Sequence, residues 1–157
     1  MEAWNVTEQA LVGLDLKYSR QVLTALLPMG LTVIFHGVGI DQVHRFFRRF
    51  GRPVMRGSHR LARNAVVVGM VAILLVSHFF GAVVWAALYF FAGLTDNMSH
   101  AMLYSLNAYT TMGASDIHLR KGWVGFGNFE SMTGMLMFGW STAVLADIIG
   151  RFSNADE

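Results

Sequence analysis

Long apolar stretches, broken by short polar ones, dominate the chain. Three of them are long enough to cross a bilayer as helices, at 21–43, 65–93 and 128–150. A helix needs about 20 residues to cross the hydrocarbon, so each stretch qualifies as a span. The second is longer than a straight crossing requires, which leaves length for tilt or for projection beyond the bilayer. The pattern predicts an all-α integral membrane protein with three transmembrane helices.

A fourth apolar stretch, Met98–Tyr109, lies between the second and third spans. Its 12 residues would form a helix of about 18 Å, too short to cross a bilayer and suited to a re-entrant half-helix. Asp96 or Asn97 is placed to cap its start, and the negative end of its dipole would point towards the membrane centre. Polar residues follow at 110–116. Non-helical backbone after such a half-helix is tolerated at membrane depth only where it is buried in protein or lines a watery cavity.

The placement of charge predicts the orientation. Segment 44–64 has no acidic residue and carries seven arginines, at positions 45, 48, 49, 52, 56, 60 and 63. By the positive-inside rule this loop is cytoplasmic, which puts the N-terminal segment 1–20 outside and the tail 151–157 in the cytoplasm. We therefore expect a multi-pass protein of the cell's inner (plasma) membrane.

The arginines recur at steps of three and four, so they would share one face if the loop were helical. The arginines of a voltage sensor lie inside an apolar span, whereas Gly51, Pro53 and Gly57 interrupt these in a polar connector. We interpret the segment as a topology anchor that contacts anionic lipid headgroups.

Composition narrows the function further. The chain has 157 residues, room for one domain, and no cysteine, which excludes disulfides, thiolate metal sites and thiol catalysis. It has no glycine-rich phosphate loop and no His-Glu-x-x-His motif, so we expect no enzyme, and we expect no nucleic-acid partner. No basic residue precedes Lys17 and no small-residue cleavage site is present, so the first span should be retained rather than removed as a signal peptide.

The order span, half-helix, Thr-Thr-x-Gly-x-x-Asp at 110–116, span resembles the pore module of the potassium-channel superfamily, whose filter reads Thr-Thr-Val-Gly-Tyr-Gly-Asp. The chain is more closely similar to a bacterial branch of two-span pore proteins with an extra N-terminal helix. The run Gly-Met-Leu-Met-Phe-Gly-Trp-Ser-Thr-Ala at 134–143 matches the inner helix of that branch. Glu130 and the pair His36-Gly37 match it too, so the resemblance covers nearly the whole chain.

The resemblance implies a homotetramer, because one chain supplies a single pore loop and the filter needs four around an axis. Segment 94–127 would then hold the pore half-helix, the filter and the mouth. Rings of backbone carbonyls would bind monovalent cations such as K⁺ or Na⁺, with no other cofactor. The ring positions are Thr111, Met112, Gly113, Ala114 and Ser115, and the Thr111 hydroxyl would form the innermost ring.

Two substitutions in the filter predict weak selectivity. Gly113 keeps the first glycine, but Ser115 replaces the second. A left-handed residue other than glycine costs about 1–2 kcal/mol. Ala114 replaces the tyrosine whose ring packs the filter against its half-helix. We expect the outer half of the filter to be wider or looser than in a strict potassium channel.

The filter would be supported from behind by Thr110 and Asn107. Asn107 falls where related channels place an acidic or polar residue that hydrogen-bonds the filter aspartate. One alternative is an Asn107–Asp116 contact that braces the loop. The other is that Asp116 is a solvated carboxylate at the mouth, which attracts cations.

The third span should line the inner cavity. Gly134 and Gly139 are candidate hinge or close-packing positions, of which close packing is the more common role of small residues in membrane helices. Ser141 and Thr142 offer hydroxyls, and Glu130 is expected to make a structural hydrogen bond.

Two other functions stay open. His36 and His78 could be axial ligands of a haem in a small membrane electron carrier, although imidazoles hydrogen-bonded between helices are the simpler interpretation. The altered filter also fits a non-conducting accessory or scaffold protein that retains the channel fold.

Overall fold

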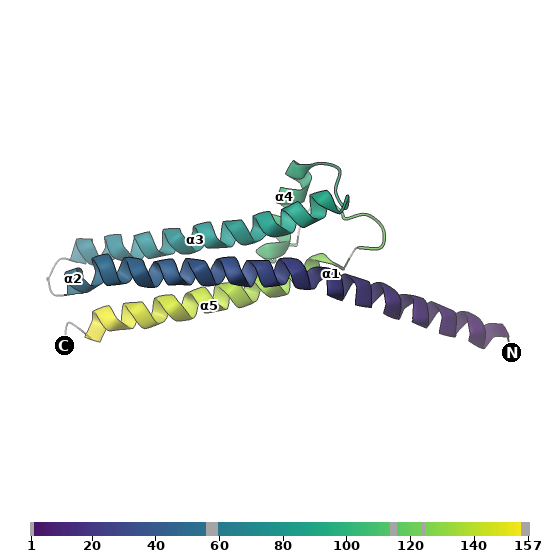
Figure 1. The fold of residues 1–157 in the computed structure, drawn as a ribbon, viewed down its shortest axis with the longest axis horizontal. Helices are drawn as coiled ribbons and strands as arrows, with labels where there is room; N and C mark the ends of the chain where they lie inside the picture. Colours follow the sequence, from purple (N-terminus) through teal and green to yellow (C-terminus); the bar gives the residue numbers. More distant parts are fainter. Residues whose placement is uncertain (1, 56–59, 114–115, 124, 155–157) are drawn as a thin grey trace.

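The computed structural model describes residues 2–55, 60–113, 116–123 and 125–154. This part of the chain is helical, without strands, in the order α1 (Glu2–Phe46), the π-helix η1 (Phe47–Gly51), α2 (Arg52–Met55), α3 (Arg60–Phe91), α4 (Met98–Tyr109) and α5 (Gly127–Asn154) (Figure 1). Three stretches are long and apolar enough to cross a membrane, Tyr18–Met55, Arg60–Phe91 and Gly127–Phe152. The prediction of an all-helical chain with three span-length helices is confirmed.

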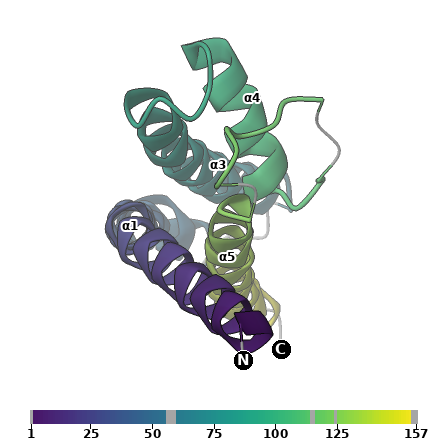
Figure 2. The same cartoon turned by 90° about the vertical axis from the view of Figure 1, so that its right-hand side faces the viewer.

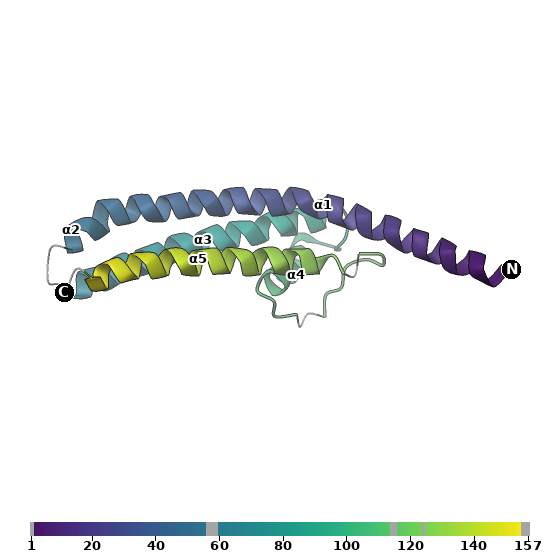
Figure 3. The same ribbon diagram turned by 90° about the horizontal axis from the view of Figure 1, so that it is seen from below.

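The three long helices run side by side in an antiparallel bundle (Figures 1 and 3). The short helix α4 and both of its flanking loops lie at one end, where α3 ends and α5 begins, and α2 and the C-terminus lie at the other (Figure 1). Viewed along the bundle, α4 lies beside α3 and α5 on the side away from α1 (Figure 2). The N-terminal part of α1 continues past the bundle at the α4 end (Figure 1).

The N-terminal segment is helical from Glu2 and continuous with the first span, since α1 runs from Glu2 to Phe46. The stretch before the span contains no proline and only one glycine, Gly13, so little in it opposes helix.

The basic segment 44–64 is helical as far as Met55, although breaks were expected at Gly51 and Pro53. A π-turn at Phe47–Gly51, in which the Arg52 N–H bonds to the Phe47 carbonyl, takes up the irregularity. Pro53 follows in α2, where the backbone stays helical although proline offers no N–H to the preceding turn. Gly57 lies outside the described residues.

The interior has two apolar clusters. The α4-end cluster is built on Trp85, Tyr89, Tyr109 and Phe126, and the α2-end cluster on Val43, Phe47, Met70, Ile148 and Phe152. Between them lies a band of buried polar side chains, described below. The apolar clusters hold the two ends of the bundle together, and the polar band separates them.

Helix α4 begins at a capped residue. Asn97 has extended backbone (φ −153°) and its Oδ1 accepts a hydrogen bond of 2.8 Å from the His100 N–H. Of the two candidates in the sequence, Asn97 is therefore the cap. Asp96 is exposed one position earlier.

Replacing Asn97 by Ala should lower the stability of the folded chain by about 1 kcal/mol, because the His100 N–H loses its partner. Asn97→Asp should retain most of the stability, since a carboxylate also caps. The measurement is the thermal unfolding midpoint in detergent, with Asp96→Ala as the matched control. An equal loss in Asn97→Ala and Asp96→Ala would contradict the assignment.

Candidate functional site

The loop after α4 begins with a left-handed turn. Thr111 has φ +60°, and its N–H bonds to the Ala108 carbonyl at 3.0 Å, while the Met112 N–H bonds to the Asn107 carbonyl at 2.9 Å. This pair of bonds is a Schellman cap, in which the left-handed residue is usually glycine. A β-branched threonine there costs about 1–2 kcal/mol. Gly113 is also left-handed (φ +67°), as the filter resemblance required, whereas Ala114 and Ser115 lie outside the described residues.

The C-terminal end of α4 is docked on α5. A β-carbon at Gly134 would overlap the Tyr109 carbonyl oxygen, so the two backbones approach as closely as only glycine allows. Ser131 Oγ donates a 2.7 Å hydrogen bond to the Ala108 carbonyl. Gly134 is therefore a close-packing position. Gly139, by contrast, has no atom of this chain near the place of a β-carbon.

The described residues of the predicted filter are exposed in the single chain. Thr110 and Thr111 are exposed, and the Met112 side chain is 72% exposed. Asp116 is exposed as well, and within the described residues the Asn107 side chain makes no hydrogen bond to it. In the single chain Asp116 is exposed and the Asn107–Asp116 hydrogen bond is not formed.

A cavity of about 200 Å³ lies behind the loop. Its walls come from α4, the loop after it and the start of α5, and include Asn107, Gly113, His118 and Asn128. The loop therefore stands off the helices instead of packing directly against them.

A buried acid of α5 joins α3, α4 and α5. Glu130 is fully buried at the start of α5. Its Oε2 accepts a 2.6 Å hydrogen bond from the Tyr89 hydroxyl of α3, and its Oε1 lies 2.5 Å from Ser105 Oγ of α4. Ser105 Oγ is also 2.7 Å from the Ala82 carbonyl oxygen.

A protonated Glu130 would satisfy both contacts of Ser105. A serine hydroxyl has one proton and can donate to one acceptor. Ser105 faces two oxygens that would both need it, the Ala82 carbonyl and Glu130 Oε1. Both contacts are hydrogen bonds when neutral Glu130 donates to Ser105 and Ser105 donates to Ala82. An ionised carboxylate buried here without a cation would also be costly.

The polar band between the clusters is a continuous chain of hydrogen bonds, which we call the histidine layer: Ser77, His36, Ser141, His78 and Tyr109. Successive contacts along it are 3.2, 3.1, 3.0 and 3.2 Å. All five side chains are buried, and they come from α1, α3, α4 and α5. The layer ties the residue just before the loop, Tyr109, to the middle of all three long helices.

The histidine layer does not fit a haem. The two imidazole rings lie against each other with centroids 4.7 Å apart, and both Nε2 atoms point at the same Ser141 hydroxyl. Axial ligands must instead approach an iron from opposite faces of a flat ring. As arranged in this bundle, His36 and His78 therefore do not form an axial ligand pair for a haem.

The histidine layer also corrects the expectation for Ser141, which was assigned to the inner cavity. Its side chain is turned into the protein and bonded to both histidines. Thr142 is exposed and bonds back to the Phe138 carbonyl at 2.9 Å. The reason is helical geometry, since adjacent residues point about 100° apart and cannot both face one cavity.

Sequence reasoning missed several members of these networks. Ser77, Tyr89, Ser105 and Tyr109 are single hydroxyls in apolar runs, and each is buried. The sequence signal for these residues was a hydroxyl within a membrane helix, because such a hydroxyl often forms a hydrogen bond to another helix.

Compared with known proteins, the chain matches no protein-family model, no curated protein sequence and no solved structure.

Glu130→Gln should be tolerated, because a neutral amide keeps one donor and one acceptor at the place of the protonated acid. Glu130→Ala should cost about 3 kcal/mol or more, since it leaves the Tyr89 and Ser105 hydroxyls without this partner. Thermal unfolding midpoints of the purified variants at neutral pH measure both. If Gln were as damaging as Ala, Glu130 would be ionised in the folded protein.

Gly134→Ala should destabilise the chain by about 1–3 kcal/mol, because α4 must move away from α5 to admit the methyl group. Gly30→Ala is the matched control, a mid-helix glycine of α1 with open space around it. The control should be neutral or slightly stabilising, since alanine favours helix. Equal midpoints for the two variants would disprove the close approach.

Proposed function

We propose that the chain is one subunit of a homotetrameric cation channel with the architecture of the potassium-channel superfamily. In this proposal α4 is the re-entrant half-helix and residues 110–116 form the filter. The observation that carries it is α4 itself. It is a 12-residue helix, too short to span, docked between α3 and α5 and followed by an exposed loop with left-handed backbone at Thr111 and Gly113.

The surface of the single chain supports assembly around an axis. An exposed face of α5 carries small residues at helical spacing, namely Gly139, Thr142, Ala143 and Ala146. Small residues let membrane helices approach one another closely. The exposed polar loop at 110–113 also needs protein or water around it at membrane depth. Four copies with α5 and the loop facing inward meet both requirements.

The permeant ions in this proposal are monovalent cations, K⁺ or Na⁺, held by carbonyl rings of the filter. Selectivity is weak, because Ala114 and Ser115 stand where a potassium filter has tyrosine and glycine. The arginine-rich end, which carries α2 and the C-terminus, lies in the cytoplasm, and the α4 end faces outward. The membrane is the cell's inner (plasma) membrane.

The test is to give Ala114 and Ser115 the tyrosine and glycine of a potassium filter and to measure ion permeation. In proteoliposomes or planar bilayers, the parent should conduct and discriminate poorly between potassium and sodium. Ala114→Tyr combined with Ser115→Gly should raise the potassium-over-sodium permeability ratio, because glycine relieves left-handed strain and tyrosine packs against the half-helix. Reversal potentials in mixed solutions measure the ratio, and native mass spectrometry counts subunits. Gly113→Val, which strains a left-handed position, is the control expected to abolish permeation.

Two outcomes would overturn the proposal. A monomer or two-fold dimer as the dominant species in lipid would remove the pore. Correct tetramers that conduct in neither form would favour the non-conducting scaffold protein instead.

A further inference from the structure

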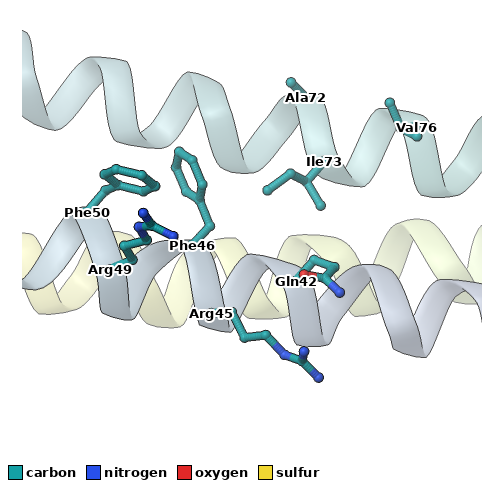
Figure 4. A pocket seen from close by; sticks show the side chains of 8 residues that line it. All are labelled: Gln42, Arg45, Phe46, Arg49, Phe50, Ala72, Ile73 and Val76. Atoms are coloured by element: carbon teal, nitrogen blue, oxygen red, sulfur yellow. The ribbon is translucent and has the colours of Figure 1, made fainter.

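A groove runs along the surface between α1 and α3, on the side away from α5 (Figure 4). Its end near η1 encloses about 660 Å³, between Arg45, Phe46, Arg49 and Phe50 on one wall and Ile73 and Val76 on the other. In Figure 4 Phe46, Phe50 and Ile73 lie between the two helices, whereas the Arg45 side chain extends from the side of α1 that is turned away from α3.

The groove continues towards the middle of the bundle. A second hollow of about 290 Å³ shares Ile73 and Val76 with the first and ends at Phe35 and Phe80. From Phe35 to Phe50 the α1–η1 wall covers 15 helical steps, or about 22 Å at 1.5 Å per residue. One leaflet of a bilayer is about 15 Å of hydrocarbon plus its headgroups, so the groove has the length of a single lipid chain with its headgroup.

The groove is mostly apolar, with Gln42 lining both hollows and Ser77 the second, and it is positive at one end. Arg45 and Arg49 form no ion pair with any described residue. Arg49 lies with its guanidinium carbon 5.4 Å from the centre of the Phe50 ring. The acid nearest in sequence, Asp41, is one turn from Arg45 but is not within ion-pair distance. Two unpaired guanidinium groups beside a hydrocarbon-lined groove complement an anion that carries an apolar tail.

We propose that this groove is a binding site for one anionic phospholipid of the cytoplasmic leaflet. The phosphate contacts Arg49 and, once its exposed side chain turns towards the groove, Arg45, and one acyl chain lies against Phe46, Ile73 and Val76 towards Phe35. The site requires a membrane-spanning bundle with its arginines at the cytoplasmic face. It does not require that the chain conducts, so the site and the channel can fail separately.

The site differs from general attraction to the basic segment, because only two of the arginines belong to it. Arg48 and Arg52 are exposed in the same stretch and do not line the groove. They carry the same charge at the same end of the bundle and therefore provide a matched comparison.

The experiment measures retained lipid by native mass spectrometry after purification in the presence of phosphatidylglycerol or phosphatidylcholine of equal chain length. The parent should keep phosphatidylglycerol in preference to phosphatidylcholine. Arg45→Gln with Arg49→Gln should weaken phosphatidylglycerol retention roughly tenfold or more, as expected for two arginines near an anionic headgroup. Arg48→Gln with Arg52→Gln, the same change in net charge, should leave retention close to that of the parent.

A second pair of variants tests the apolar part without touching charge. Val76→Trp fills the groove and should reduce retention, whereas Leu75→Trp, at an exposed position outside it, should not. If the arginine variant fails to fold, the comparison of Val76→Trp with Leu75→Trp still tests whether lipid binds in the groove.

Equal losses in the two arginine pairs would reduce the site to diffuse attraction and overturn the proposal. Equal retention of the two lipids by the parent would overturn it as well. So would displacement of the lipid by glycerol phosphate alone, since the acyl chain would then contribute nothing.

Discussion

The bundle is organised around a constraint that hydrocarbon imposes, namely that polar side chains inside it must satisfy one another. In the histidine layer, five groups with one proton each serve four hydrogen bonds. All four can run in one direction from Ser77 to Tyr109 with both imidazoles neutral. If any of these helices slipped by one residue, its side chains in the histidine layer would turn about 100° away. Buried polar atoms would then be left without hydrogen-bond partners. The register of four helices therefore depends on these contacts, and the apolar clusters on either side are free to be less specific.

The same logic positions α4. Its start is fixed by a cap, its middle by Ser105 against Glu130 and the Ala82 carbonyl, and its end by Gly134 and the Tyr109 hydroxyl. A helix this short has little stability of its own, because nucleation is costly and few bonds follow. Its placement depends on polar contacts to α3 and α5. The loop after α4 starts from a fixed point, which any ordered arrangement of carbonyls around an axis requires.

Much of this was predictable from sequence, and the failures have a common physical cause. Apolar length predicted three spans, and the bounds of α4 followed from where apolar residues end. Choosing between Asp96 and Asn97 requires knowing at which residue α4 begins, and assigning Ser141 to a cavity requires knowing the rotation of α5 about its own axis. That rotation is set by partners far away in the chain, such as His36 for Ser141. The helix that continues past Gly51 likewise depends on Phe47 packing against Phe152, which no local pattern reveals.

Helix α1 has 45 residues, about 68 Å at 1.5 Å per residue, against some 30 Å of hydrocarbon. Much of it must therefore stand in water or among headgroups, and its N-terminal part continues beyond the bundle (Figure 1). Pro28 interrupts its ladder of backbone bonds, since it offers no N–H to the Thr24 carbonyl. Below that point the helix is clamped at His36. The part of α1 before Pro28 is therefore joined to the bundle through a turn that lacks one backbone hydrogen bond, so it can bend relative to the part that His36 holds in place.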